Sequence, residues 1–185
     1  MEQTGARPGT NVLVSAPSLS ASKHETCLDL LAPAPPEQLD VLRVTYSASP
    51  AELVADWRDH HGELPARMGI VVVGDQAGLR EEDHDVPDSV FVTTANPNDP
   101  TGLGMRLNNY LTDHEEGIQL VACFDSLTEL LQFVDVQSAF KFLHMLAGQL
   151  REVDAVGHFH VDPAAHDDQT ISRLKPLFDD AVDHT

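Results

Sequence analysis

The sequence contains few basic residues. Of its 185 residues, 11 are Lys or Arg and 30 are Asp or Glu, which gives a formal net charge of −19. Nucleic-acid affinity depends on Lys and Arg side chains that neutralise phosphates, and anionic membrane surfaces attract clusters of the same residues. The composition therefore argues against a nucleic-acid partner and against a membrane partner.

Hydrophobic targeting segments and frequent cysteines are also missing. Residues 1–10 contain no apolar stretch typical of a signal peptide, and no uninterrupted apolar run approaches the ~18 residues of a membrane span. Cys27 and Cys123 each lie within an apolar run. We interpret both as buried reduced thiols rather than as a disulfide or a metal-binding pair. These features predict a cytoplasmic protein.

The acidic residues that are present have a distinctive composition. Asp outnumbers Glu by 19 to 11, and there are three Lys residues. Molar salt shortens the Debye length to about 3 Å and screens the repulsion among such charges. The composition resembles that of halophilic cytoplasmic proteins, and we expect a haloarchaeal source. The length fits one domain, which we place at residues 11–185 after a flexible N-terminus at residues 1–10.

Strand-like and helix-like segments alternate along the chain. The apolar runs predict strands at residues 11–14, 41–46, 69–74, 90–94, 118–124 and 155–161. Helical periodicity and capping signals predict helices at residues 22–32, 50–60, 101–114, 127–134 and 136–152, with a terminal helix through residues 171–182 that Pro176 kinks or restarts. The acidic stretch 75–88 is expected to be an exposed loop. This alternation predicts an α/β fold, a three-layer α/β/α sandwich with a mostly parallel central sheet.

Several helix starts are predicted from their capping residues. Ser22 with Glu25, and Ser49 with Glu52, have the spacing of capping boxes. Thr101 is the expected cap of the third helix.

The loop after the first strand occupies the place of a phosphate-binding loop. Such a loop needs glycines so that backbone N–H groups can surround the phosphate, followed by Lys and Ser or Thr. Aligning Lys23 with the motif lysine puts Pro17 and Ser22 at the glycine positions and His24 at the Ser/Thr position. The negative charge of Glu25 also lies at the helix start that would receive phosphate. We therefore favour a loop that only packs over one that binds nucleotide.

The segment from Ile118 to Thr128 is similar to a Walker B strand, with an apolar run that ends at Asp125. Together with the following Ser-Leu-Thr and the order of elements, it resembles KaiC-like proteins of the RecA superfamily. The layout also resembles a family of haloarchaeal proteins. The resemblance implies a RecA-like sheet, and it implies degenerate nucleotide-binding positions at Ser20, Ser22, Lys23, His24, Asp125 and Ser126.

The resemblance also bears on catalysis. In KaiC-like ATPases one or two glutamates follow the strand that ends here at Tyr46, and they orient the attacking water. This sequence has Ser47 and Ala48 at those positions. Without the phosphate loop and the glutamate, positioning and charge neutralisation are lost, and these supply most of phosphoryl-transfer catalysis. We expect no hydrolysis, and an alternative role for Asp125 is to cap the following helix.

A histidine-rich segment offers a different chemistry. On a strand, His158 and His160 point to the same face, as zinc ligands can. Asp162 and His166 could complete a metal shell at the end of that strand. The alternative is that these histidines only form hydrogen bonds, with Asp167 or Asp168 capping the last helix.

The sequence therefore leads to one main functional hypothesis and one rival. The main hypothesis is a non-hydrolysing KaiC-like domain that acts through protein contacts, with a protein partner or as a homo-oligomer, in regulation or signalling. It requires no cofactor. The rival is a nucleotide- or metal-dependent enzyme, with ATP and Mg²⁺ or with Zn²⁺, that uses Asp125 and the cluster of His158, His160 and His166.

Overall fold

The computed structural model describes residues 7–74 and 86–184 and contains a seven-stranded sheet in which every pair of neighbouring strands is parallel. The strand order is β4-β3-β2-β5-β6-β1-β7. The strands are β1 Asn11–Ser15, β2 Leu39–Thr45, β3 Arg67–Val73, β4 Val90–Ala95, β5 Gln119–Asp125, β6 Val156–Val161 and β7 Asp180–Asp183. The predictions for residues 1–6 and 75–85 lie outside the described residues.

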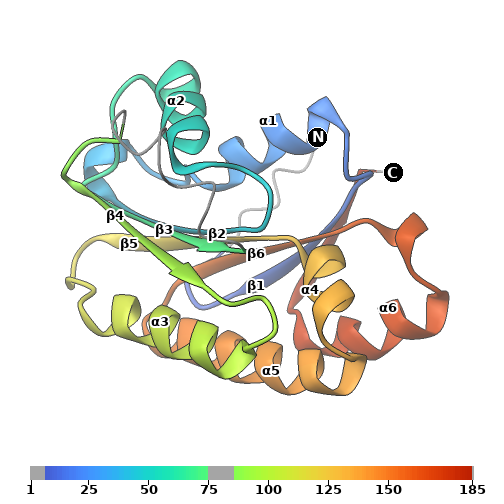
Figure 1. The fold of residues 1–185 in the computed structure, drawn as a ribbon. Coiled ribbons are helices and arrows are strands. Elements are labelled where there is room, and N and C mark those ends of the chain that lie inside the picture. Colours follow the sequence, from blue (N-terminus) through green and yellow to red (C-terminus); the bar gives the residue numbers. More distant parts are fainter. Residues whose placement is uncertain (1–6, 75–85, 185) are drawn as a thin grey trace.

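Helices cover both faces of this sheet, as Figure 1 shows. One face carries α1 Ala21–Leu30 and α2 Pro50–His61, and the other carries α3 Pro100–Thr112, α4 Leu127–Phe133, α5 Val136–Glu152 and α6 Asp168–Leu174. Short 3-10 turns occur at Pro36–Gln38, Pro163–Ala165 and Lys175–Leu177. The predicted three-layer α/β/α fold is confirmed. No described helix is both long and apolar enough to cross a membrane.

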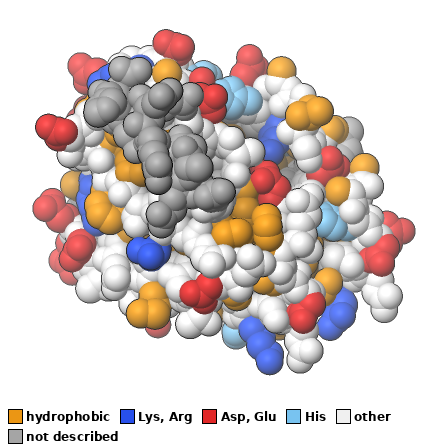
Figure 2. Space-filling model, in the orientation of Figure 1, with side chains coloured by type: hydrophobic (Ala, Val, Ile, Leu, Met, Phe, Trp, Pro, Cys, Tyr) orange, Lys and Arg blue, Asp and Glu red, His pale blue; other side chains and the backbone are white. Residues whose placement is uncertain are grey.

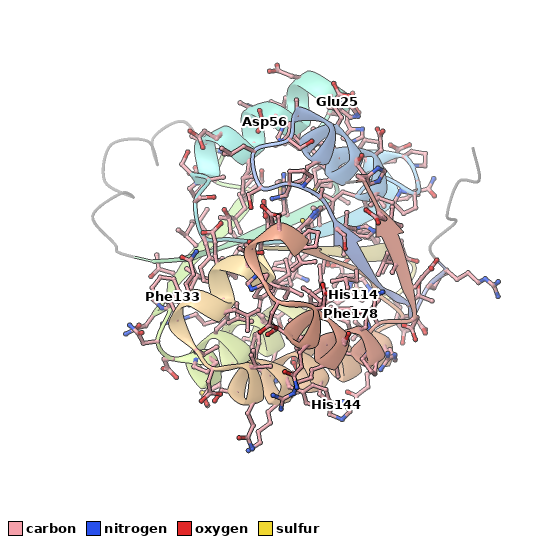
Figure 3. All side chains as sticks on the ribbon, turned by 90° about the vertical axis from the view of Figure 1, so that its right-hand side faces the viewer. Glu25, Asp56, His114, Phe133, His144 and Phe178 are labelled. Atoms are coloured by element: carbon pink, nitrogen blue, oxygen red, sulfur yellow. The ribbon has the colours of Figure 1, made fainter. Side chains whose placement is uncertain are left out.

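The sheet separates two hydrophobic cores. Phe124, Phe142 and Phe159 belong to the core beneath α3 and α5, whereas Trp57 and Val121 belong to the core beneath α1 and α2. In Figure 3 Glu25 and Asp56 lie on the α1 and α2 side of the sheet, and Phe133, His144 and Phe178 lie on the other side. Because side chains alternate along each strand, a single strand contributes to both cores.

The prediction of a terminal helix through residues 171–182 is wrong beyond Leu174. Pro176 lacks a backbone N–H and lies in a 3-10 turn, after which the chain extends as β7. This strand pairs with β1, so that Val182 lies opposite Val14. The tertiary pairing available at the edge of the sheet outweighs the helical spacing of the apolar residues.

Two predicted helix caps also differ from the structure. Ser20 rather than Ser22 caps α1, and Asp99 rather than Thr101 caps α3, where Pro100 occupies the first turn. The Ser49–Glu52 capping box of α2 is confirmed, with both reciprocal hydrogen bonds present. In α3 the proline fixes the first helical residue, which moves the cap to the residue before it.

Candidate functional site

An ion pair between α1 and β5 lies at the carboxyl edge of the sheet, where ligands bind in doubly wound folds. Lys23 Nζ is 2.8 Å from Asp125 Oδ1. The Lys23 side chain is 14% exposed and that of Asp125 is 30% exposed. The lysine on α1 and the aspartate at the end of β5 therefore neutralise each other directly.

Two pairs of side chains link α1 to β5, and the step from one pair to the next is nearly the same length on the helix as on the strand. Cys27 is four residues after Lys23 on the helix, and Cys123 is two residues before Asp125 on the strand. Four helical residues rise about 6 Å and two strand residues about 6.6 Å. The Cys27 and Cys123 Sγ atoms accordingly lie 3.1 Å apart, one step below the ion pair. Sequence reasoning located both thiols in the interior correctly but did not expect them to meet.

The loop between β1 and α1 uses its own polar groups internally. The Ser18 N–H and hydroxyl both donate to Asp162 Oδ2, at 3.0 and 2.9 Å. The Ala16 N–H donates to the carbonyl of Val161, and the Ser20 N–H donates to the carbonyl of Pro17. These N–H groups are therefore not directed together at a phosphate-sized ligand.

The other predicted nucleotide-binding residues have structural contacts. Ser20 accepts a hydrogen bond from the Lys23 N–H, and Ser126 accepts one from the Glu129 N–H as the cap of α4. Asp125 is therefore not the cap of this helix, which the alternative interpretation had expected. His24 Nε2 lies 3.3 Å from Asp56 Oδ2 on α2. The side chain of Ser22 lies outside the described part of the structure.

Glu129 and Tyr46 border the ion pair, and sequence reasoning missed both. The Ser47 hydroxyl lies 3.5 Å from Glu129 Oε1, and burial together with the charge of Asp125 raises the pKa of Glu129. Burial and the charge of Glu129 also raise the pKa of Tyr46. The sequence did contain a signal for Glu129. It lies four residues after Asp125, in the first turn of the helix α4 that follows strand β5.

The four predicted metal ligands do not meet. His158 and His160 are buried, and Asp162 holds Ser18 at the strand end. The His166 ring nitrogen Nε2 lies 3.1 Å from the hydroxyl oxygen of Thr128. Because β6 directs its even-numbered residues beneath α1 while the chain turns away after Val161, the predicted shell is not formed.

A different cluster of metal-binding side chains lies in the interior. Among the described residues, the ligand atoms of Cys27, Cys123 and His160 lie within 4.8 Å of one another. Arg43 is buried beside them and directs Nη2 at Cys27 Sγ, 3.7 Å away. The hydrogen bond from Cys123 and the charges of His160 and Arg43 lower the pKa of Cys27. Burial lowers the pKa of His158 to about 4, so its imidazole is neutral at pH 7.

Acidic side chains are scattered over the face shown in Figure 2, and basic ones are few. The same face has no continuous basic stripe of the kind that follows a nucleic-acid backbone.

Comparison with solved structures supports the fold. A protein from Pyrococcus horikoshii OT3 is similar with a TM-score of 0.63 at 9% identity, over 97% of this chain and 83% of that chain. In total, 226 chains of solved structures match, and an arrangement this common indicates no particular activity. No curated protein matches the sequence significantly. The model of the family of unknown function DUF7504 matches residues 9–184, and the chain therefore belongs to that family.

Proposed function

We propose that this protein is a KaiC-like domain of the RecA superfamily that does not hydrolyse nucleotide and acts through protein contacts in a regulatory or signalling role. The Lys23–Asp125 ion pair carries the proposal. In a working site of this type the lysine would contact phosphate and the aspartate would hold Mg²⁺ through water. Here each satisfies the other, so a nucleotide would have to break the pair before it could bind.

The surroundings of the pair support the same conclusion. The Ser18 N–H donates to Asp162, and the two positions that would carry a glutamate after β2 are Ser47 and Ala48. Phosphoryl transfer depends on positioned donors and charge neutralisation. Among the described residues named here, the lysine, the aspartate and the Ser18 N–H are already bonded within the chain.

A groove between α3 and α5 supports a role in protein contacts. It has a volume of about 430 Å³, and its walls include Met105 and Met145, which are 65% and 44% exposed. Methionine side chains are flexible and adapt to apolar partner surfaces. Self-association through this groove is the form of contact that can be tested with the chain alone.

Calorimetric titration with Mg-ATP in molar KCl tests the first half of the proposal. We expect no binding heat, and micromolar binding would overturn the proposal. For the second half, light scattering at increasing protein concentration should reveal self-association that Met145→Glu weakens. Leu19→Glu is the matched control, because Leu19 is fully exposed on a different part of the surface.

One observation favours the rival enzymatic function. Glu129 has a raised pKa and lies near both members of the ion pair, and such groups are candidates for general acid or base catalysis. A nucleotidase assay of the wild-type chain and of Glu129→Gln separates the two functions. Turnover that disappears in Glu129→Gln would establish the rival.

A further inference from the structure

The buried cluster beneath α1 brings together two thiols and one imidazole from three different elements. Cys27 lies on α1, Cys123 on β5 and His160 on β6, and they are 4%, 1% and 1% exposed, respectively. Strands β5 and β6 are direct neighbours, with Cys123 paired to His158. His160 therefore follows one step further along the same face of β6, beside the place where α1 crosses the sheet.

The imidazoles in this region lack well-aligned hydrogen bonds. Within the described part of the chain, no ring nitrogen of His158 or His160 makes one, although the Cys27 thiol interacts with His160. An uncompensated buried polar group costs about 1–3 kcal/mol in proteins. Native proteins rarely leave such groups unpaired, so an unpaired buried imidazole beside two thiols indicates a missing ligand.

The donor set selects a soft metal ion. Thiolate sulfur together with imidazole nitrogen favours Cu⁺ or Zn²⁺ over Mg²⁺ or Ca²⁺, which prefer oxygen. Binding of either ion would require both thiols to lose their protons to solvent or buffer. A bond from one ring nitrogen of His160 to the metal would also satisfy an atom that is otherwise unpaired.

The charge of Arg43 distinguishes between the two ions. Its guanidinium is buried at 4% exposure, and Nη1 has no hydrogen-bond partner among the described residues. Two thiolates balance the guanidinium and a monovalent ion, whereas a divalent ion leaves one extra positive charge in the cluster. The carboxylates of Asp125 and Asp56 also act on Arg43, but they already pair with Lys23 and His24. Buried net charge is strongly unfavourable, and three ligands suit the low coordination number of Cu⁺.

We propose that Cys27, Cys123 and His160 form a buried binding site for a soft metal ion, with Cu⁺ as its preferred occupant. Arg43 supplies the remaining positive charge and restricts the site to a monovalent ion. This proposal does not depend on whether nucleotide can bind at the Lys23–Asp125 pair, although both lie on the contact between α1 and β5.

Chelator competition tests this site in the full, untagged chain. The reduced protein is kept anaerobic in molar KCl and titrated with Cu⁺ against bicinchoninate, and with Zn²⁺ against a chromophoric zinc chelator. We expect one equivalent of Cu⁺ to be retained while Zn²⁺ is lost to its chelator. Retention of Zn²⁺ with loss of Cu⁺ would overturn the assignment to Cu⁺, and loss of both ions would overturn the site.

Variants then identify the ligands. Outer-shell substitutions typically weaken metal affinity about 10- to 100-fold, so Cys123→Ser and His160→Leu, which remove ligands, should weaken it by at least about 100-fold. His144→Leu is the matched control, because this histidine lies on α5 on the other side of the sheet. Equal affinity in wild type and Cys123→Ser would overturn the proposal.

X-ray absorption at the copper edge of the wild-type protein gives a readout that does not depend on whether a variant folds. Two sulfur ligands and one nitrogen ligand are expected in the first shell. A shell of oxygen and nitrogen alone would overturn the proposal. So would a Cys27–Cys123 disulfide in an anaerobically purified protein that retains no metal.

Discussion

The two faces of β6 differ in chemistry. Toward α5, Phe159 packs against Phe124 and Phe178, with ring centroids 5.9 and 5.2 Å away. Toward α1, His158 and His160 are equally buried but make no well-aligned hydrogen bonds among the described residues. The side chains on the two faces are therefore equally buried, and the faces differ in whether buried polar atoms are left without hydrogen bonds.

This difference separates a face that stabilises the domain from the face on which we propose a metal site. An apolar face gains free energy from each buried methylene group, whereas a face with unpaired imidazoles loses some of that gain. Natural proteins keep such costs where a site requires them.

Phe159→Ala should destabilise the protein most. Loss of a buried phenylalanine leaves a cavity and typically costs about 3–5 kcal/mol of unfolding free energy. Urea unfolding in molar KCl measures the loss. Phe91→Ala is the control, because Phe91 is 55% exposed on β4. A loss below about 1 kcal/mol for Phe159→Ala would show that this face is loosely packed.

Gly157→Ala should also destabilise the apolar face. A Cβ at Gly157 would collide with the Asn11 side chain and lie 3.1 Å from Leu150 Cδ1. Overpacking of this kind costs about 1–3 kcal/mol. Gly148→Ala in α5 is a matched control, because a Cβ there meets no atom within 4 Å. The control should gain about 0.5–1 kcal/mol from helix propensity, and equal effects at the two glycines would contradict the packing argument.

His158→Leu should act in the opposite direction to Phe159→Ala. Replacing an unpaired buried imidazole with an apolar side chain of similar size removes a desolvation cost, and we expect the metal-free protein to gain about 1 kcal/mol. Thermal or urea unfolding in the presence of a metal chelator measures this. The exposed His144→Leu should stay within about 0.5 kcal/mol of wild type. A clear loss of stability in His158→Leu would mean that the polar face has partners of its own.

The Lys23–Asp125 pair should give the smallest effect. A double-mutant cycle to Ala should yield a coupling of about 0.5–1 kcal/mol at the lowest salt at which the chain stays folded, and less in molar KCl, because both side chains are partly solvated. The Arg151–Asp179 pair, with a 3.3 Å separation and greater exposure, is the control and should couple more weakly. Equal coupling in the two pairs would show that the Lys23–Asp125 pair is no stronger than an ordinary surface ion pair.

The sequence predicted much of the architecture because periodicity is a local property. The six predicted strands and the helices at α2, α3, α4 and α5 follow from apolar spacing and from caps such as Ser49 with Glu52. The segment around Val182 was misassigned, because its short strand is stabilised by pairing with β1. Local spacing cannot report a partner that lies about 170 residues away in sequence.

The candidate site shows the same limit. Lys23 and Asp125 were each identified from the position of a motif, yet neither motif indicated that the two side chains would bind each other. The thiols of Cys27 and Cys123 were predicted to be buried, but their contact depends on the path of α1 over β5. The histidines were grouped with Asp162 and His166 because of sequence proximity, but the chain turns away after β6, so Asp162 bonds with Ser18 and His166 lies beside Thr128.

The shortage of basic residues remains the property that the sequence determined by itself. A net charge of −19 depends only on composition, and the prediction that the chain has no nucleic-acid or membrane partner rests on it. The tertiary structure decided that Lys23 meets Asp125 and that Cys27, Cys123 and His160 come together. The strand order places β5 between β2 and β6, and α1 crosses above it, so residues about 100 positions apart come into contact.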